Sequence, residues 1–120
     1  MPNSSSSAVL TELERCLVVT CPSALSPATM ERLSAQALQL CSERAFKAVV
    51  VDLSAIDLID LTEWRWLRGL SGGVSLMGSS AWFVGLRPSV ISALMMMNAP
   101  IEGMSFAMGV EEALQLSRAT

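Results

Sequence analysis

The residues best suited to chemistry lie close together in the segment DLSAIDLIDLTEW, residues 52–64. Asp57 and Asp60 are three residues apart, and Thr62 supplies a hydroxyl shortly after them. A pair of carboxylates can act as general acid and general base when their surroundings push the two pKa values apart. Two acids at this spacing are more often a solvated loop edge and a helix cap, so we predict no catalytic residue here.

The same residues match the beginning of a helix. With Asp60 at the N-cap, Glu63 falls at N3, which makes a D-x-x-E capping box. Thr62 then lies in the first turn, where backbone N–H groups and the positive end of the helix dipole stabilise a phosphate. Thr62 is therefore the candidate phosphorylation site. The nearby carboxylate of Asp60 would repel an added phosphate and so change the binding of a partner.

Several chemistries are excluded by what the sequence lacks. The chain contains no histidine, so a Ser-His-Asp or Cys-His nucleophile and imidazole metal sites are excluded. The glycines of SGGVS, residues 71–75, are not followed by the G-K-[ST] of a phosphate-binding loop. VGLRPS, residues 84–89, lacks the G-x-G-x-x-G of a dinucleotide site. We therefore predict no enzyme activity, no metal site and no cofactor.

The three cysteines, Cys16, Cys21 and Cys41, are odd in number and form no C-x-x-C pair. This pattern argues against a disulfide framework and against a zinc ribbon. We expect three buried, reduced side chains, because free cysteine is among the most buried residue types. The expected compartment is the cytoplasm.

Length and composition indicate one domain that makes contacts with other proteins. At 120 residues and 52% hydrophobic, the chain can close one core. We expect that domain at 8–120, after a disordered leader at 1–7 that lacks the pattern of a signal peptide. A net charge of -3 disfavours nucleic acid as a partner. Mean hydropathy is +0.49, but no apolar run approaches the ~20 residues of a membrane span, so surplus apolar surface is expected to contact other chains.

Short apolar runs alternate with segments of helical periodicity along the whole chain. This order predicts an α/β fold with a mixed, mostly parallel central sheet of 4–5 strands and about four helices. The run AVVVDL, residues 48–53, is apolar except for Asp52 and does not alternate, which is typical of a strand covered on both faces. The expected strands are residues 9–13, 16–21, 48–53, 81–86 and 104–109, and the expected helices lie within 26–45, 61–70, 88–98 and 110–118, with the SGG segment at 71–73 breaking the chain. The first helix should begin with Ser26 as N-cap and Pro27 at N1, and its apolar residues, among them Met30, Leu33 and Ala37, recur at helical spacing.

The expected second helix carries a wide apolar arc. Trp64 and Trp66 fall on neighbouring stripes, so at least one of them should reach the surface. Arg65 and Arg68 flank the pair, and Trp and Arg are enriched in interface hot spots. The alternative that both rings belong to the core stays open. Three consecutive methionines, residues 95–97, cannot all face one side of a helix, so part of this adaptable surface is expected to make contacts.

Three segments together carry a family resemblance. AVVVDLSAIDLIDLTEW, AWFVGLRPSVISAL and VEEALQLSR, in this order and spacing, resemble the STAS domain family of anti-sigma-factor antagonists. The motifs GLRP and GVEEAL look most like the small scaffold proteins of the stressosome, a bacterial stress-sensing assembly. The resemblance implies the STAS fold and a binding module in place of an enzyme. It implies two kinds of partner: a serine/threonine kinase of the histidine-kinase-like ATPase fold, and other STAS-domain subunits in a homo- or hetero-oligomer.

The resemblance also implies a partner-binding surface and a switch. In the family, the residue directly after the aspartate at the helix start is the usual phosphate acceptor. Asp60 matches that aspartate, but Leu61 occupies the acceptor position and cannot accept phosphate. The switch is therefore either lost or displaced to Thr62. One step along a helix turns the side-chain direction by about 100°, so Thr62 points in another direction than Leu61. The expected partner-binding residues are Asp57, Asp60, Leu61, Thr62, Trp64, Arg65 and Arg68.

Three hypotheses about function remain open from the sequence. The first is a stressosome-like scaffold that docks a kinase and neighbouring subunits. The second is a monomeric antagonist of an anti-sigma factor, released when Thr62 is phosphorylated. The third is an enzyme or small-ligand binder that uses the loop from Asp57 to Thr62, for which no motif is present.

Overall fold

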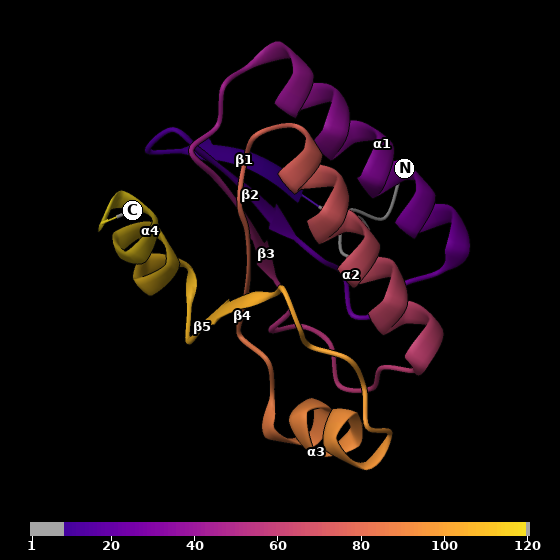
Figure 1. The fold of residues 1–120 in the computed structure, drawn as a ribbon. Coiled ribbons are helices and arrows are strands. Elements are labelled where there is room, and N and C mark those ends of the chain that lie inside the picture. Colours follow the sequence, from indigo (N-terminus) through magenta and orange to yellow (C-terminus); the bar gives the residue numbers. More distant parts are fainter. Residues whose placement is uncertain (1–8, 120) are drawn as a thin grey trace.

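A computed structural model describes residues 9–119, which form a mixed sheet with helices on both faces (Figure 1). The sheet has five strands in the order β1-β2-β3-β4-β5, so every strand pairs with its neighbour in sequence. β1 is antiparallel to β2, and the remaining pairs are parallel. The predicted fold class is thus confirmed. The elements are β1 (Val9–Leu13), β2 (Cys16–Thr20), α1 (Pro27–Glu43), β3 (Ala48–Asp52), α2 (Leu61–Leu76), β4 (Ala81–Val84), α3 (Pro88–Met96), β5 (Ser105–Ala107) and α4 (Val110–Ala119).

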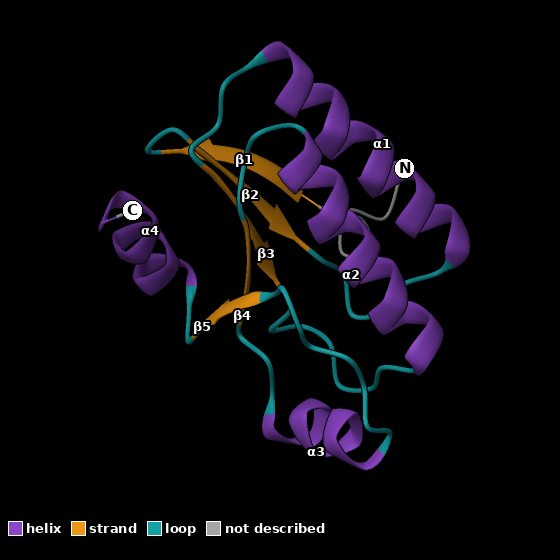
Figure 2. Ribbon diagram, viewed as in Figure 1, coloured by secondary structure: helices purple, strands orange, loops and turns teal. Residues whose placement is uncertain are grey.

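The helices divide unequally between the two faces of the sheet. α1 and α2 cover one face, α4 covers the other, and α3 lies at the end of the sheet where the parallel strands finish (Figure 2). Successive side chains of a strand point to opposite faces, so Val49 and Val51 of β3 enter the larger core while Val50 enters the smaller one beside α4. This arrangement explains why β3 is apolar from Ala48 to Val51.

α1 begins as the sequence predicts. Ser26 is the N-cap and its hydroxyl oxygen accepts a hydrogen bond from the amide of Thr29 at 3.1 Å, while Pro27 occupies the first helical position. Proline suits that position because its missing N–H would have no partner inside the helix. The apolar residues predicted at helical spacing, among them Met30, Leu33 and Ala37, are buried against the sheet.

α2 is longer than predicted. The expected break at residues 71–73 is wrong, because the helix continues through this segment to Leu76. Ser71 and Val74 are buried, so tertiary packing overrides the low helix propensity of the two glycines. A Cβ on Gly73 would lie 3.3 Å from the Leu38 side chain of α1, which is tighter than most contacts. The glycine therefore permits the two helices to approach closely.

All three cysteines are buried and reduced, as expected. Burial, and to a smaller extent the neighbouring Asp52 carboxylate, raises the pKa of the Cys21 thiol to about 12. Burial also raises the pKa of Cys41. Because the thiolate is the reactive form, Cys21 and Cys41 are poor nucleophiles near neutral pH.

The predicted leader at residues 1–7 lies outside the described residues. Within residues 9–119, none of the helices combines the length and the apolar character needed to cross a membrane.

Candidate functional site

The start of α2 is held by a complete capping box. The Asp60 carboxylate accepts a hydrogen bond from the Glu63 amide at 2.7 Å, and the Glu63 carboxylate accepts one from the Asp60 amide at 2.8 Å. The D-x-x-E prediction is therefore confirmed. A cap of this kind stabilises a helix by about 0.5 to 2 kcal/mol. It fixes the backbone of the first turn and leaves Thr62 exposed beside it.

The loop between β3 and α2 turns an apolar side chain toward solvent. Ile56 and Ile59 of this loop are buried in the main core. Leu58, between them, has 84% of its surface exposed. The sequence analysis missed this residue, although the signal was present: once the two isoleucines face the core, Leu58 must point away from it. Because its neighbours anchor the backbone, Leu58 is presented on a fixed loop.

The loop that precedes α3 braces the loop that precedes α2. Arg87 forms an ion pair with Asp57, and its Nε donates a hydrogen bond to the Ser54 carbonyl oxygen at 2.7 Å. The Ser89 hydroxyl adds a hydrogen bond of 3.2 Å to the carbonyl oxygen of Asp57. An exposed ion pair alone contributes little stability, but the two bonds to backbone carbonyls also fix the path of the loop. Residues about 30 positions apart thus form one surface.

The arrangement offers binding chemistry more than catalysis. The carboxylate of Asp57 is committed to Arg87, and that of Asp60 to the helix amide of Glu63. Both acids are exposed to solvent, so neither lies in the dry, shaped site that acid–base catalysis favours. Within residues 9–119, no three or more Cys, Asp or Glu side chains are grouped to hold a metal ion.

Comparison with protein-family models gives one match. The model described as the STAS domain matches residues 7–113. The chain belongs to the STAS domain family. A comparison with curated protein sequences found no match.

Solved structures support the STAS assignment at the level of the fold. An RsbS variant from Moorella thermoacetica is 22% identical, with a TM-score of 0.80 over 93% of this chain and 95% of its own. A chain from a structure described as the molecular architecture of the stressosome is 22% identical, with a TM-score of 0.79 over 92% and 96%. The anti-sigma-factor antagonist SpoIIAA in its unphosphorylated form is 15% identical, with a TM-score of 0.74 over 95% and 98%. Identities this low establish a shared fold.

The STAS domain exposes some, but not all, of the residues expected at its partner-binding surface. Asp57, Asp60, Thr62 and Arg65 are exposed, while Leu61 and Arg68 are half-buried. The expectation that Trp64 belongs to this surface is wrong, because its side chain is fully buried. Its indole Nε1 donates a hydrogen bond to the Pro100 carbonyl oxygen at 2.7 Å. The tryptophan that reaches the surface in part is Trp66.

Gly85 lets the two loops of the STAS domain meet. Its φ of +75° lies in the left-handed region, which side chains other than glycine rarely adopt. A Cβ at this position would lie 3.0 Å from the Asp52 carboxylate and 3.2 Å from the Ser54 amide nitrogen. The GLRP segment therefore supplies a close approach at Gly85 and a brace at Arg87 two residues later.

Replacing Gly85 by alanine is expected to reduce the free energy of unfolding by about 1 to 3 kcal/mol, the usual cost of a strained backbone position. Urea unfolding followed by circular dichroism measures this change. Gly78→Ala is the matched control, because Gly78 also has a positive φ, +87°, but no atom within 4 Å of an added Cβ. Gly85→Ala should cost more than the control. Equal costs would show that the close approach to Asp52 and Ser54 contributes nothing.

Proposed function

We propose that this STAS domain is a non-enzymatic protein–protein interaction module of the cytoplasm. In this proposal it binds a serine/threonine kinase of the histidine-kinase-like ATPase fold and co-assembles with other STAS-domain subunits. The contact is made by the docking surface, which we define as Asp57, Leu58, Asp60, Leu61, Thr62 and Arg65. Support comes from membership of the family and from similar structures described as RsbS, the stressosome and SpoIIAA.

The observation that carries the proposal is the exposure of Leu58 on a braced loop. A large apolar side chain surrounded by polar groups has the composition of an interface hot spot, with a desolvated centre and a wetter rim. Asp57 and Asp60 lie on either side of it in sequence and provide carboxylates to which a partner can bind. Since the capping box and Arg87 fix the backbone, binding requires little ordering of the loop.

Phosphorylation is the proposed point of departure from the usual family behaviour. Leu61 stands where the family's acceptor hydroxyl normally lies, and it is half-buried. We therefore favour a switch that has been lost over one displaced to Thr62. A module of this kind would bind its partners constitutively, and the signal would be carried by another subunit.

The second reading, a monomeric antagonist switched at Thr62, has one observation in its favour. Thr62 is exposed in the first turn of α2, close to a cap carboxylate that already occupies the Glu63 amide. A phosphate there would meet the negative charge of Asp60, so it would weaken a contact made by this surface. The third reading, an enzyme or small-ligand binder at residues 57–62, has no such support from the contacts of the described residues.

Incubation with ATP and a kinase of the histidine-kinase-like ATPase fold, encoded near the gene, tests the switch. We expect neither wild type nor Thr62→Ala to gain phosphate, as measured by intact-protein mass spectrometry. Ser89→Ala is the control, because Ser89 is an exposed hydroxyl near the same loop. One phosphate on the wild type and on Ser89→Ala, but none on Thr62→Ala, would overturn the lost switch and favour the antagonist.

A further inference from the structure

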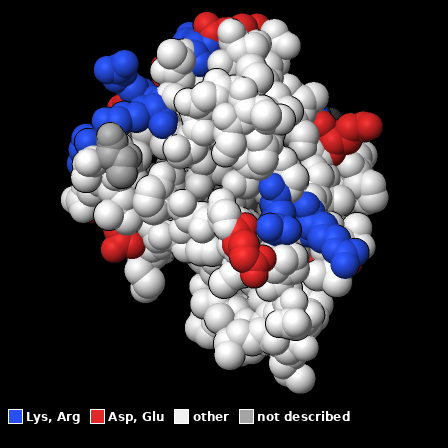
Figure 3. Space-filling view, viewed as in Figure 1, with Lys and Arg blue, Asp and Glu red and all other residues white. Residues whose placement is uncertain are grey.

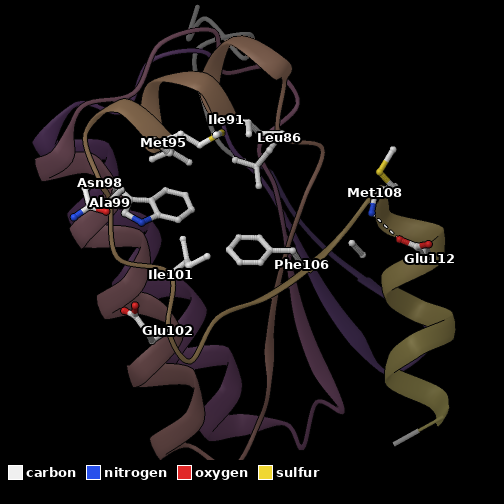
Figure 4. Close-up of a pocket in the computed structure, with 13 residues that line it drawn as sticks. Leu86, Ile91, Met95, Asn98, Ala99, Ile101, Glu102, Phe106, Met108 and Glu112 are labelled. Atoms are coloured by element: carbon white, nitrogen blue, oxygen red, sulfur yellow. Dashed lines mark hydrogen bonds between the residues drawn. The ribbon is translucent and has the colours of Figure 1, made fainter.

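An open apolar groove lies on the surface of the domain, and none of the docking-surface residues is among those that line it. It runs between α3, the segment that leads into β5, and the start of α4, with a volume of about 890 Å³ (Figure 4). Its apolar walls include Leu86, Ile91, Met95, Ile101, Phe106 and Met108. Met95 and Met108 are largely exposed, so the groove is a surface feature and not an interior cavity.

Among the described residues, the charged side chains that line the groove are both acidic, Glu102 and Glu112. Arg68 lies outside the lining, and its Nη2 donates a hydrogen bond to the backbone carbonyl oxygen of Glu102 at 3.0 Å. Glu112 also accepts a hydrogen bond from the Met108 amide at 2.7 Å, shown in Figure 4. Among residues 9–119, Glu102 takes part in no ion pair. The occupant that fits best combines an apolar side chain with a positive charge.

The turn between β1 and β2 offers this combination. Its two central residues, Glu14 and Arg15, have φ of +52° and +67°, a conformation that costs free energy for residues other than glycine. Next to them, Leu13 at the end of β1 is 45% exposed. We call Leu13, Glu14 and Arg15 the hairpin tip. Leu13 pairs with Cys16, so Glu14 and Arg15 are the two central residues of a hairpin turn, and positive φ at both positions is the usual geometry of such a turn. The turn carries an exposed apolar side chain, Leu13, and an exposed basic one, Arg15, two residues apart.

The hairpin tip has no net charge by itself, but Lys47 and Arg118 lie beside it and give this end of the molecule a surplus of positive charge. Glu14 is paired with Arg118, and the Lys47 ammonium donates a hydrogen bond to the carbonyl oxygen of Arg118 at 3.3 Å. Arg15 forms no ion pair within residues 9–119. Figure 3 shows Lys and Arg side chains gathered at this end of the molecule. The tip lies at the end of the sheet away from α3, so a tip and a groove can contact two different neighbours (Figure 1).

We propose that the groove receives the hairpin tip of a second copy of this chain. The proposal rests on the co-assembly part of the proposed function and specifies where subunits meet. Charge decides between this contact and a two-fold one. If two grooves faced each other in a two-fold contact, the glutamates of one groove would repel those of the other. A head-to-tail contact instead places Arg15 of one copy opposite Glu102 of the next. Each added copy leaves one tip and one groove free, so the assembly closes into a ring or extends.

Light scattering coupled to size-exclusion chromatography, over a range of protein concentrations, tests this contact. We expect the wild type to form species larger than one chain, and Arg15→Glu or Glu102→Arg to need at least about tenfold higher concentration to assemble. An equimolar mixture of the two variants should regain wild-type assembly, because each tip then meets a groove of opposite charge. The Arg15→Glu, Glu102→Arg double variant should regain it as well.

Arg32→Glu is the matched control. It makes the same change in net charge as Arg15→Glu, but on the exposed face of α1 away from tip and groove, and should assemble like wild type. A monomeric wild type, an equal effect of Arg32→Glu, or a mixture that stays dissociated would each overturn the proposal. If Glu102→Arg alone failed to assemble and mixing it with Arg15→Glu did not restore assembly, the groove would have another occupant, such as a basic segment of a different protein. Kinase binding that still depends on Leu58 would leave the kinase-binding part of the proposed function standing in every case.

Discussion

Replacing Trp64 by alanine is expected to reduce the free energy of unfolding by about 3 to 5 kcal/mol, the usual cost of emptying a large aromatic site in a core. The ring is fully buried, stacks on Phe106 with centroids 6.3 Å apart, and packs against Phe83 at 6.5 Å. This cluster joins α2 to β4 and to the edge strand β5. For a domain at the lower end of the ordinary range of about 5 to 15 kcal/mol, this loss would remove most of the stability. Urea unfolding, followed by circular dichroism because the change removes a fluorophore, measures the loss.

Two further variants separate packing from hydrogen bonding in this prediction. Trp64→Phe keeps an aromatic ring but leaves the Pro100 carbonyl oxygen without its indole donor, so we expect a loss of about 1 to 3 kcal/mol. Trp66→Ala is the control, because Trp66 is half-buried on the same helix. It should cost clearly less than Trp64→Ala. A cost for Trp66→Ala as large as that for Trp64→Ala would contradict the assignment of Trp64 as the core residue.

Local sequence signals were sufficient for most of the architecture. The apolar run at β3 identified a strand covered on both faces, and the structure buries Val49, Val50 and Val51 completely. Ser26 followed by Pro27 marked the start of α1, and the D-x-x-E pattern marked the start of α2. These features depend on residues that are close in the chain, so a single sequence contains them in full.

The features that the sequence could not supply depend on residues far apart in the chain. Periodicity placed Trp64 and Trp66 on neighbouring stripes, but which ring enters the core is decided by Phe83 and Phe106, which belong to other strands. The continuation of α2 through Gly73 likewise depends on Leu38 of α1. Such contacts form only when the sheet brings separate elements together, so propensity alone misjudged both points.

The candidate site divides in the same way. The helix cap at Asp60 was predictable because both partners of the capping box lie within four residues. The brace from Arg87 to Asp57 and Ser54 was not, because it joins the ends of two different strands. Leu58 is an intermediate case. Its exposure follows once Ile56 and Ile59 are known to be buried, but a short apolar run does not show which of its residues face the core.

Replacing Leu58 by aspartate is expected to weaken binding of a kinase or STAS partner by about 30-fold or more, which corresponds to the roughly 2 kcal/mol of a hot-spot residue. The side chain is exposed and braced on a fixed loop, so its loss removes apolar contact area without disturbing the core. The free energy of unfolding should therefore change by no more than about 0.5 kcal/mol. Isothermal titration calorimetry with the purified partner, together with urea unfolding of the free protein, measures both quantities.

Leu76→Asp is the matched control for this prediction. Leu76 is 89% exposed, and it lies at the last residue of α2, whereas Leu58 lies just before the first. The two variants make the same chemical change on similarly exposed residues, so only location distinguishes them. Leu58→Ala separates lost apolar contact from the added charge, which would sit near Asp57 and Asp60; it should also weaken binding. If Leu76→Asp weakened binding as much as Leu58→Asp, the contact would not be centred on the start of α2, and the docking surface would have to be placed elsewhere.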